Sequence, residues 1–338
     1  MNLHIIWFTL LGVLFAGYAI LDGFDFGVGM LLLLVRDDQE RRLLLNSIGP
    51  VWDGNEVWLV TGGGAMFAAF PGVYATTFSG FYLVFMALLL ALIFRAVSIE
   101  FRSKEPMAWW RRLWDTCFFL GSLLAALLLG AFVGNLAHGV PLNHAGNFTG
   151  SFWSLLNPYA LLVGVTTVAL FLMHGAIYLV MKTEGALHDR IRGWVNNAII
   201  FFIICAVTTT LTTLLYVPHM VTAFRLHPGL FMVPLLMMLA IANVPREIHH
   251  RRDWAAFCSS AGAIALLMAL LGIGLFPDLV YATNQAAYSL TIYNASSTGH
   301  TLGVMLVIAF IGMPLVLLYT TYIYWVFRHK VRLDAHSY

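Results

Sequence analysis

The chain has 338 residues, of which 60% are hydrophobic and only 10% are charged, and its mean hydropathy is +0.84. This composition excludes a disordered chain and a soluble domain, and it is typical of a polytopic membrane protein. The formal net charge of +2 says little about partners, because basic residues in such proteins sort by membrane side, and we expect no nucleic acid among the partners.

Nine segments are apolar over the roughly 20 residues that a spanning helix requires. The seventh is the shortest and is bounded by Pro228 and Pro245. We therefore predict an all-α polytopic membrane protein with about nine transmembrane helices. In chain order the segments are 5–34, 46–70, 74–99, 114–137, 157–181, 194–217, 229–244, 255–276 and 301–327.

Basic residues alternate sharply between successive loops. They follow the first, third, fifth, seventh and ninth segments, whereas the loops after the second, fourth and eighth contain none. Only Arg225, after the sixth segment, breaks the alternation. By the positive-inside rule, the N-terminus lies outside and the C-terminus lies in the cytoplasm.

Carboxylates interrupt the first two segments. Asp22 and Asp25 lie within the first, and Asp53 and Glu56 lie within the second, where Trp52 and Trp58 flank them in the sequence WDGNEVW. A charge in hydrocarbon costs roughly 3 kcal/mol on insertion scales, so it is retained mainly for a pathway, a partner or a ligand.

The third segment adds two charges near its cytoplasmic end. Glu100 is at that end, and Arg95 lies about a turn and a half deeper. If the first three segments are neighbours, these residues form a ladder from Glu100 through Arg95 to the acids of the second and then the first segment. Such a ladder is typical of a proton half-channel. The alternative is that the acids are packing devices among the glycines, which predicts tolerance of neutral isosteres.

The histidines give little support for redox cofactors in this chain. A haem between membrane helices usually needs a histidine ligand at membrane depth, and only His174 of the twelve lies well inside a segment. We expect His174 to be a buried polar residue, and we expect no metal site and no catalytic residue in this chain.

A weak internal repeat suggests how the helices are grouped. GVLFAGYAILDGFDFGV, from Gly12, aligns without gaps with GVTTVALFLMHGAIYLV, from Gly164, and places Asp22 on His174. A parallel duplication explains this, although chance similarity of glycine-rich apolar helices does so too. The duplication predicts one four-helix bundle over 1–137, a second over 138–276, and an outer loop, ninth helix and cytoplasmic tail over 277–338.

Several long motifs resemble subunit II of the cytochrome bd-type quinol oxidases. They are LDGFDFGVGML, the stretch from ERRLLLNSIGPVWDGNEVW to FSGFY, FRAVSIEFRSK, GNLAHGVP, HGAIYLVMKT, YSLTIYNASS and PLVLLYTTYIYW. The resemblance extends over essentially the whole chain. One departure is the short loop after the sixth segment, where some relatives carry a long insertion.

The resemblance implies a subunit of a quinol:O2 oxidoreductase that reduces O2 to water and generates proton motive force in the bacterial cytoplasmic (inner) membrane. Two haems b and one haem d are then expected in the partner, subunit I, and none in this chain. Further expected contacts are quinol, membrane lipid, a small single-helix subunit, and ubiquinone or menaquinone held as a structural lipid.

The family's proposed proton-path residues fall on Asp53, Arg95 and Glu100. Glu56 and Glu100 vary in type among relatives, to Gln and Asp. Two rival functions remain open at this stage. A proton-coupled secondary transporter would also use buried acids and glycine-broken helices, and a structural scaffold would use the acids only for packing.

Overall fold

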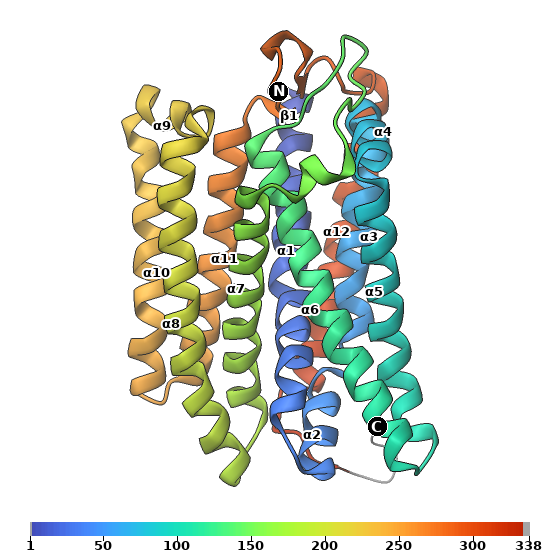
Figure 1. Cartoon of the computed structure of the whole chain (residues 1–338), viewed down its shortest axis with the longest axis vertical. Helices are drawn as coiled ribbons and strands as arrows, with labels where there is room; N and C mark the ends of the chain where they lie inside the picture. Colours follow the sequence, from blue (N-terminus) through green and yellow to red (C-terminus); the bar gives the residue numbers. More distant parts are fainter. Residues whose placement is uncertain (1, 334–338) are drawn as a thin grey trace.

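The computed structural model describes residues 2–333, in which long helices run between two ends of the molecule (Figure 1). The predicted all-α fold is confirmed. In this range nine helices have 18 residues or more: α1 (Leu3–Leu31), α3 (Trp52–Ala69), α5 (Tyr82–Phe101), α6 (Ala108–His138), α7 (Pro158–Lys182), α8 (Gly185–Tyr216), α10 (Met232–His249), α11 (Asp253–Leu275) and α12 (Gly299–Val326).

Eight of these helices are long and apolar enough to span a membrane. The ninth, α3, has a lower hydropathy because its first two turns contain Asp53, Asn55 and Glu56 and its middle contains three consecutive glycines. The polar start of α3 therefore needs cover from other protein segments.

Short elements connect the long helices at both ends. The helical ones are η1 (Leu32–Leu34), α2 (Asp38–Ile48), α4 (Pro71–Gly80), η2 (Arg102–Lys104), η3 (Phe152–Leu156), η4 (Pro218–Val221), α9 (Thr222–Leu226), η5 (Pro228–Phe231) and η6 (Ala286–Tyr288). Strands β1 (Asp278–Val280) and β2 (Leu290–Thr291) pair antiparallel, with Asp278 opposite Thr291 and Val280 opposite Leu290.

Several predicted boundaries differ from those in the structure. The segment predicted over 46–70 is divided, because α2 ends at Ile48 and Gly49-Pro50 separates it from α3. The segment predicted over 74–99 begins earlier as α4 and continues as α5, with a break at Phe81. The segment predicted to end at Pro245 continues to His249, because the fixed φ of proline is compatible with a helix even though one backbone donor is lost.

Helix α1 is at the centre of the molecule and packs against α3, α6, α7 and α11. Its crossing with α7 depends on two glycines: a Cβ atom added to Gly175 would lie 2.5 Å from the Cα atom of Gly27. Only glycine permits the two backbones to approach so closely. This crossing fixes the height of α1, and therefore of its two aspartates, relative to the rest of the core.

The packing of α1, α3, α5 and α6 corresponds to that of α7, α8, α10 and α11. Within the first set, α1 packs against α3 and α6, and α5 against α6; within the second, α7 packs against α8 and α11, and α10 against α11. This correspondence is what a duplication of four-helix units would produce. The division of the chain into 1–137, 138–276 and 277–338 stays a prediction.

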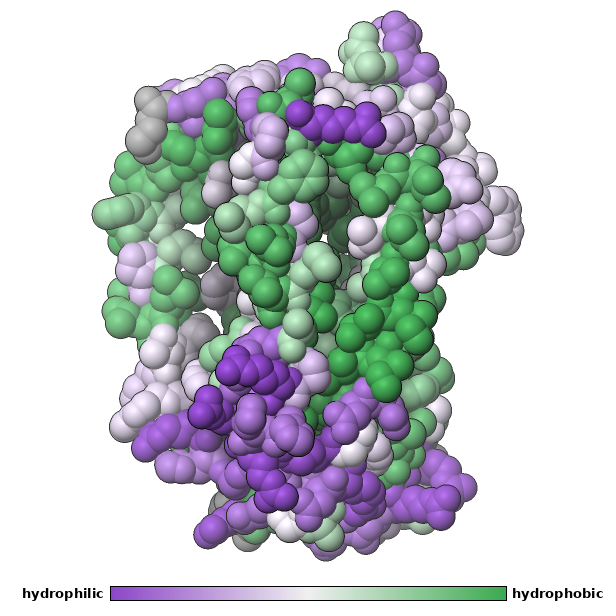
Figure 2. Space-filling view, turned by 90° about the vertical axis from the view of Figure 1, so that its left-hand side faces the viewer, coloured by the Kyte–Doolittle hydropathy of each residue, from purple (hydrophilic) through white to green (hydrophobic). Residues whose placement is uncertain are grey.

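Hydrophobic side chains form a broad band around the middle of the visible face, and hydrophilic side chains gather at its two ends (Figure 2). The N-terminus and the β hairpin lie at one end, and α2 and the C-terminal tail lie at the other (Figure 1). The latter holds the arginine-rich connections of α2, η2 and the α10–α11 turn, and we call it the basic end.

Candidate functional site

A buried ion pair joins α1 to α5. Arg95 Nη1 donates to Asp22 Oδ2 over 3.0 Å, and Arg95 Nη2 donates to the other carboxylate oxygen, Asp22 Oδ1. Neither side chain has exposed surface. The Arg95 guanidinium also lies over the ring of Phe26, 4.3 Å from its centre, so an aromatic face covers the side not occupied by carboxylates.

Glu56 of α3 reaches the same guanidinium. Arg95 Nη1 donates to Glu56 Oε1 over 3.0 Å, and 25% of the Glu56 side chain is exposed. Glu56 therefore reaches both the buried Arg95 and the surface of the chain.

Asp25, one turn beyond Asp22 on α1, completes the group. Its Oδ2 lies 3.8 Å from Arg95 Nη2 and accepts a 2.7 Å hydrogen bond from Asn55 Nδ2. Asn55 also donates to the Leu21 carbonyl and accepts from the Tyr324 hydroxyl of α12 over 2.8 Å. Asp25 Oδ1 has no hydrogen-bond partner within residues 2–333. We call Asp22, Asp25, Glu56 and Arg95 the carboxylate cluster.

The structure brings some residues of the predicted ladder together and leaves Asp53 apart from them. Arg95 does meet both acids of α1 and one acid of α3. Asp53, however, is exposed on the first turn of α3 and makes no ion pair within 4 Å in the described part of the chain. Of the two acids of the second predicted segment, the structure therefore brings only Glu56 to Arg95.

The other predicted residues lie around the cluster. Glu100 is half-buried at the basic end of α5, a turn and a half from Arg95. Trp58 is buried against Gly17 of α1, where any larger residue would collide with its ring, and Trp52 is half-buried at the start of α3. Trp58 therefore packs the α1–α3 contact.

His174 of α7 is fully buried, and both of its ring nitrogens are engaged. Nδ1 lies 2.7 Å from Ser260 Oγ and Nε2 lies 3.0 Å from the Ile20 carbonyl oxygen. Its ring stacks on Phe257. A haem iron would need one of these nitrogens free, so His174 does not fit the role of an axial ligand here.

A second cluster of charged side chains, at the basic end, was not predicted from the sequence. Asp115 of α6, whose side chain has no exposed surface, accepts hydrogen bonds from Arg41 over 2.7 Å and from Arg102 over 2.5 Å. Arg102 and Arg111 also bind Asp38, over 2.7 and 2.8 Å. Partial burial raises the pKa of Asp38, but the hydrogen bond and charge of Arg102 and the charge of Arg111 outweigh it and lower that pKa below its ordinary value.

Asn55 and Tyr324 were also missed as site residues. Asn55 lies inside the WDGNEVW motif, but an amide carries no charge and so gave no signal of its own. Tyr324 is 269 positions away from its partner Asn55, so no local pattern connects the two.

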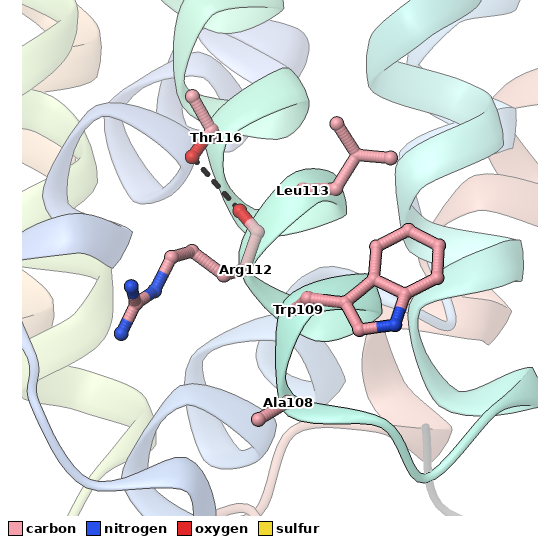
Figure 3. A pocket seen from close by; sticks show the side chains of 5 residues that line it. All are labelled: Ala108, Trp109, Arg112, Leu113 and Thr116. Atoms are coloured by element: carbon pink, nitrogen blue, oxygen red, sulfur yellow. Dashed lines mark hydrogen bonds between the residues drawn. The ribbon is translucent and has the colours of Figure 1, made fainter.

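One surface hollow lies away from the cluster. It has a volume of about 540 Å³ and lies on the outer face of α6, where Ala108, Trp109, Arg112, Leu113 and Thr116 line it (Figure 3). In Figure 3 the Arg112 side chain points away from Trp109 and Leu113. None of these residues belongs to the carboxylate cluster.

Comparison with known proteins gives one consistent result. Residues 3–327 match the family model of cytochrome bd terminal oxidase subunit II. The chain is 38% identical to the cytochrome bd-I ubiquinol oxidase subunit 2 of Escherichia coli K12, covering 99% of this chain and 98% of the relative. It is 38% identical to the cytochrome bd ubiquinol oxidase subunit 2 of Bacillus subtilis 168, covering 98% and 97%.

The fold agrees with a solved structure. A chain of the bd oxidase from Geobacillus thermodenitrificans superimposes with a TM-score of 0.81, covering 97% of this chain and 99% of that chain, at 18% identity.

Proposed function

Because the chain belongs to the cytochrome bd terminal oxidase subunit II family, we propose that it delivers protons to the haem-bearing partner subunit of a quinol oxidase. The chain is a multi-pass membrane component of that complex, in which subunit 1 is its partner. The reaction proposed for the complex is the oxidation of quinol and the reduction of O2 to water, with generation of proton motive force.

The observation that carries the proposal is the charge balance of the carboxylate cluster. Three carboxyl groups surround one guanidinium, and three of these four side chains are fully buried. With every acid ionised, the cluster would carry a net charge of two negative units inside the membrane, which is strongly unfavourable. Neutrality requires the cluster to hold protons, and acids that share protons can also pass them on.

The open oxygen of Asp25 supports the same function. Oδ1 is buried and has no hydrogen-bond partner among the described residues, and buried polar atoms without protein partners usually bind a proton or a water molecule. A proton on Asp25 and an ion pair between Arg95 and Asp22 together satisfy the charges on α1.

Glu56 gives the cluster a route to the partner subunit. Its partly exposed side chain opens onto the surface of α3 on which Asp53 lies one turn closer to the basic end. We therefore assign an order from the basic end toward the partner: Glu100 first, then the carboxylate cluster with Glu56 as its last member, and then Asp53. In this order Asp53 acts at the subunit boundary and not in the core.

The surface of α3 supports this position for the partner. An exposed stripe runs along one face of α3, with residues spaced by three or four positions. It begins at the Asp53 carboxylate, which would be costly in contact with lipid, and includes the exposed Gly64, which permits a close helix–helix approach. The stripe consists of Asp53, Val57, Val60, Thr61, Gly64 and Phe67.

Neighbouring helices extend the stripe into a broad apolar face. Large apolar side chains are exposed along α12, very little of which is buried within this chain. Others are exposed along much of α5. We propose that subunit 1 binds this face of α3, α5 and α12.

The haems are assigned to the partner. His174 is the one histidine well inside a predicted span, and both of its ring nitrogens are engaged by protein atoms. The haems therefore supply their redox chemistry from subunit 1, and this chain contributes carboxyl groups, one guanidinium and the surface that receives the partner.

The positive-inside rule supports an orientation with the basic end in the cytoplasm and the N-terminus outside, in the bacterial inner membrane. Protons would then enter the cluster from the cytoplasm. The family assignment supports the oxidase and gives no support to the transporter.

Asp53→Asn tests the proposal in the intact complex. We expect slower O2 reduction with the haem spectrum unchanged, because the variant removes a proton carrier and leaves the haem-bearing subunit intact. Wild-type turnover in Asp53→Asn would exclude this residue from the pathway. Haem that remained with this chain after separation from its partner would contradict the assignment of the haems.

A further inference from the structure

A second hollow at the basic end carries cationic groups. It lies between α8 and α10, has a volume of about 240 Å³, and is lined by Arg192, Asn196, Pro245, Ile248, His249 and Arg251. No carboxylate is among these lining residues. Figure 2 looks onto this side of the molecule and shows hydrophilic side chains at the basic end directly below the hydrophobic band.

The backbone of Arg251 is in an unusual conformation. Its φ of 57° is in the left-handed region, and it is the one residue other than glycine with positive φ in the described chain. Arg251 N–H donates to the Ile248 carbonyl over 3.1 Å, and Arg252 N–H donates to the Glu247 carbonyl over 2.9 Å. These bonds form a Schellman motif that ends α10, in which the position of Arg251 is usually occupied by glycine.

A side chain at that position has a conformational cost that glycine does not have. Such outliers are often explained by a function of the side chain. Arg251 is exposed, and its guanidinium has no hydrogen bond or ion pair with any residue from 2 to 333, so the fold does not use its charge.

The guanidinium of Arg192, unlike that of Arg251, is bound by other groups of the protein. Arg192 donates to the Ile248 carbonyl over 2.5 Å and binds Asp253, which fixes its side chain at the rim of the hollow. The hollow therefore combines one anchored guanidinium with one unpartnered guanidinium and the amide of Asn196.

The surroundings indicate a ligand that also has an apolar part. α10 packs mainly on α11 and only weakly on α8. Above the hollow, large apolar side chains of α8 and α10 are exposed, including Ile204 of α8 and Met238 of α10. Trp254 is exposed at the basic end. A phosphate group in the hollow would thus have acyl chains directly beside the apolar surfaces of α8 and α10.

From these observations we propose that the hollow binds the headgroup of an anionic phospholipid from the leaflet at the basic end, with Arg251 as the main phosphate ligand. The guanidinium forms paired hydrogen bonds to phosphate oxygens. The ligand is a lipid and not a free anion, because the site opens onto membrane-facing helices.

Arg251→Gly is the sharpest test, because it removes the phosphate ligand and restores the residue that the Schellman motif prefers. The intact oxidase complex is delipidated in detergent, titrated with dioleoylphosphatidylglycerol and analysed by native mass spectrometry. We expect the variant to bind one phosphatidylglycerol about fivefold more weakly than wild type, with a thermal stability in lipid-free detergent that is equal or higher.

Arg332→Gly is the matched control, because Arg332 is an exposed arginine in the tail at the same end of the molecule and should leave lipid binding unchanged. Arg251→Asn, which also tolerates positive φ, serves if the glycine variant does not assemble. Equal phosphatidylglycerol binding by wild type and the Arg251 variants would overturn the proposal. Equal binding of dioleoylphosphatidylcholine, or displacement of the lipid by inorganic phosphate alone, would overturn the assignment to an anionic lipid.

Discussion

Arg95 and Asp22, 73 positions apart in the chain, form a hydrogen-bonded ion pair in which neither side chain is exposed. The pair joins α5 to α1 at the height of the WDGNEVW motif of α3, and it places the guanidinium within reach of Asp25 and Glu56 as well. One cation among three acids is an arrangement that needs protons, and this requirement connects the fold to the proposed function.

Replacement of Arg95 alone should lower the yield of assembled complex far more than replacement of both Arg95 and Asp22. Arg95→Gln leaves three acids without a counter-charge, and removal of one partner from a buried pair costs about 3–5 kcal/mol. We expect a low yield of assembled complex from Arg95→Gln and substantial recovery in the double variant with Asp22→Asn. Chromatographic yield of the complex measures both. Equal yields from the single and double variants would show that the pair is not coupled.

Glu56→Gln should slow O2 reduction more than Glu100→Gln does. The glutamine keeps the shape of Glu56 and one hydrogen bond to Arg95 but cannot carry a proton, so we expect a loss of about tenfold, or 1.4 kcal/mol in the barrier. Glu100 lies at the basic end, where water can replace it. Oxygen consumption by the purified complex measures both variants, and an equal or greater loss in Glu100→Gln would reverse the assigned order.

The exposed face of α3 should hold the partner. A Cβ atom on Gly64 would meet nothing within 4 Å in this chain, so Gly64→Leu should leave the chain folded while it blocks close approach of a partner helix. We expect less subunit 1 to co-purify. Gly12→Leu is the control, because Gly12 of α1 is equally open but lies outside the stripe. If both variants retain the partner equally, the interface lies elsewhere.

The charged group at the basic end should give a pH-dependent stability. The pKa of Asp38 is lower in the folded chain than in the unfolded chain, because Arg102 and Arg111 outweigh its partial burial. Its stabilisation is therefore complete above the unfolded pKa of about 3.9 and is lost as the pH falls through the folded pKa.

Asp38→Asn should thus lower thermal stability near neutral pH, by about 0.5–1 kcal/mol because the side chain is partly exposed. The difference from wild type should shrink below about pH 4. Melting curves of the detergent-solubilised complex at both pH values measure this. A difference that persists unchanged at low pH would show that the Arg102 and Arg111 contacts do not act through charge.

Much of the fold followed from the sequence because hydrophobic length and basic loops are local signals. The all-α class and most spans were predicted correctly in this way. The break between α2 and α3 was missed because Gly49 and Pro50 lie within an otherwise continuous pattern. The continuation of α10 through Pro245 was missed because a proline is read as the end of a helix, although its fixed φ is compatible with one.

Charged site residues were predictable in apolar segments, where charges are rare, and were missed near the helix ends, where charges are common. Asp22, Asp25 and Arg95 stand out in apolar segments, so sequence reasoning identified them. The exposure of Asp53 could not be derived, because it depends on how far the helices packed against the first turns of α3 cover each side chain. Asp115 was overlooked because it follows two arginines near a helix end, where charges are ordinary.

Proton uptake during a single turnover tests the central claim most directly. The intact oxidase is reconstituted with its basic end facing a pH indicator, reduced, and mixed with O2, for wild type and Asp25→Asn. Asparagine keeps the shape and the contact with Asn55 but cannot exchange a proton. The account predicts that proton uptake in Asp25→Asn is slowed at least about tenfold while haem reduction by quinol is unchanged. Proton uptake at the wild-type rate in that variant would contradict a pathway through the carboxylate cluster.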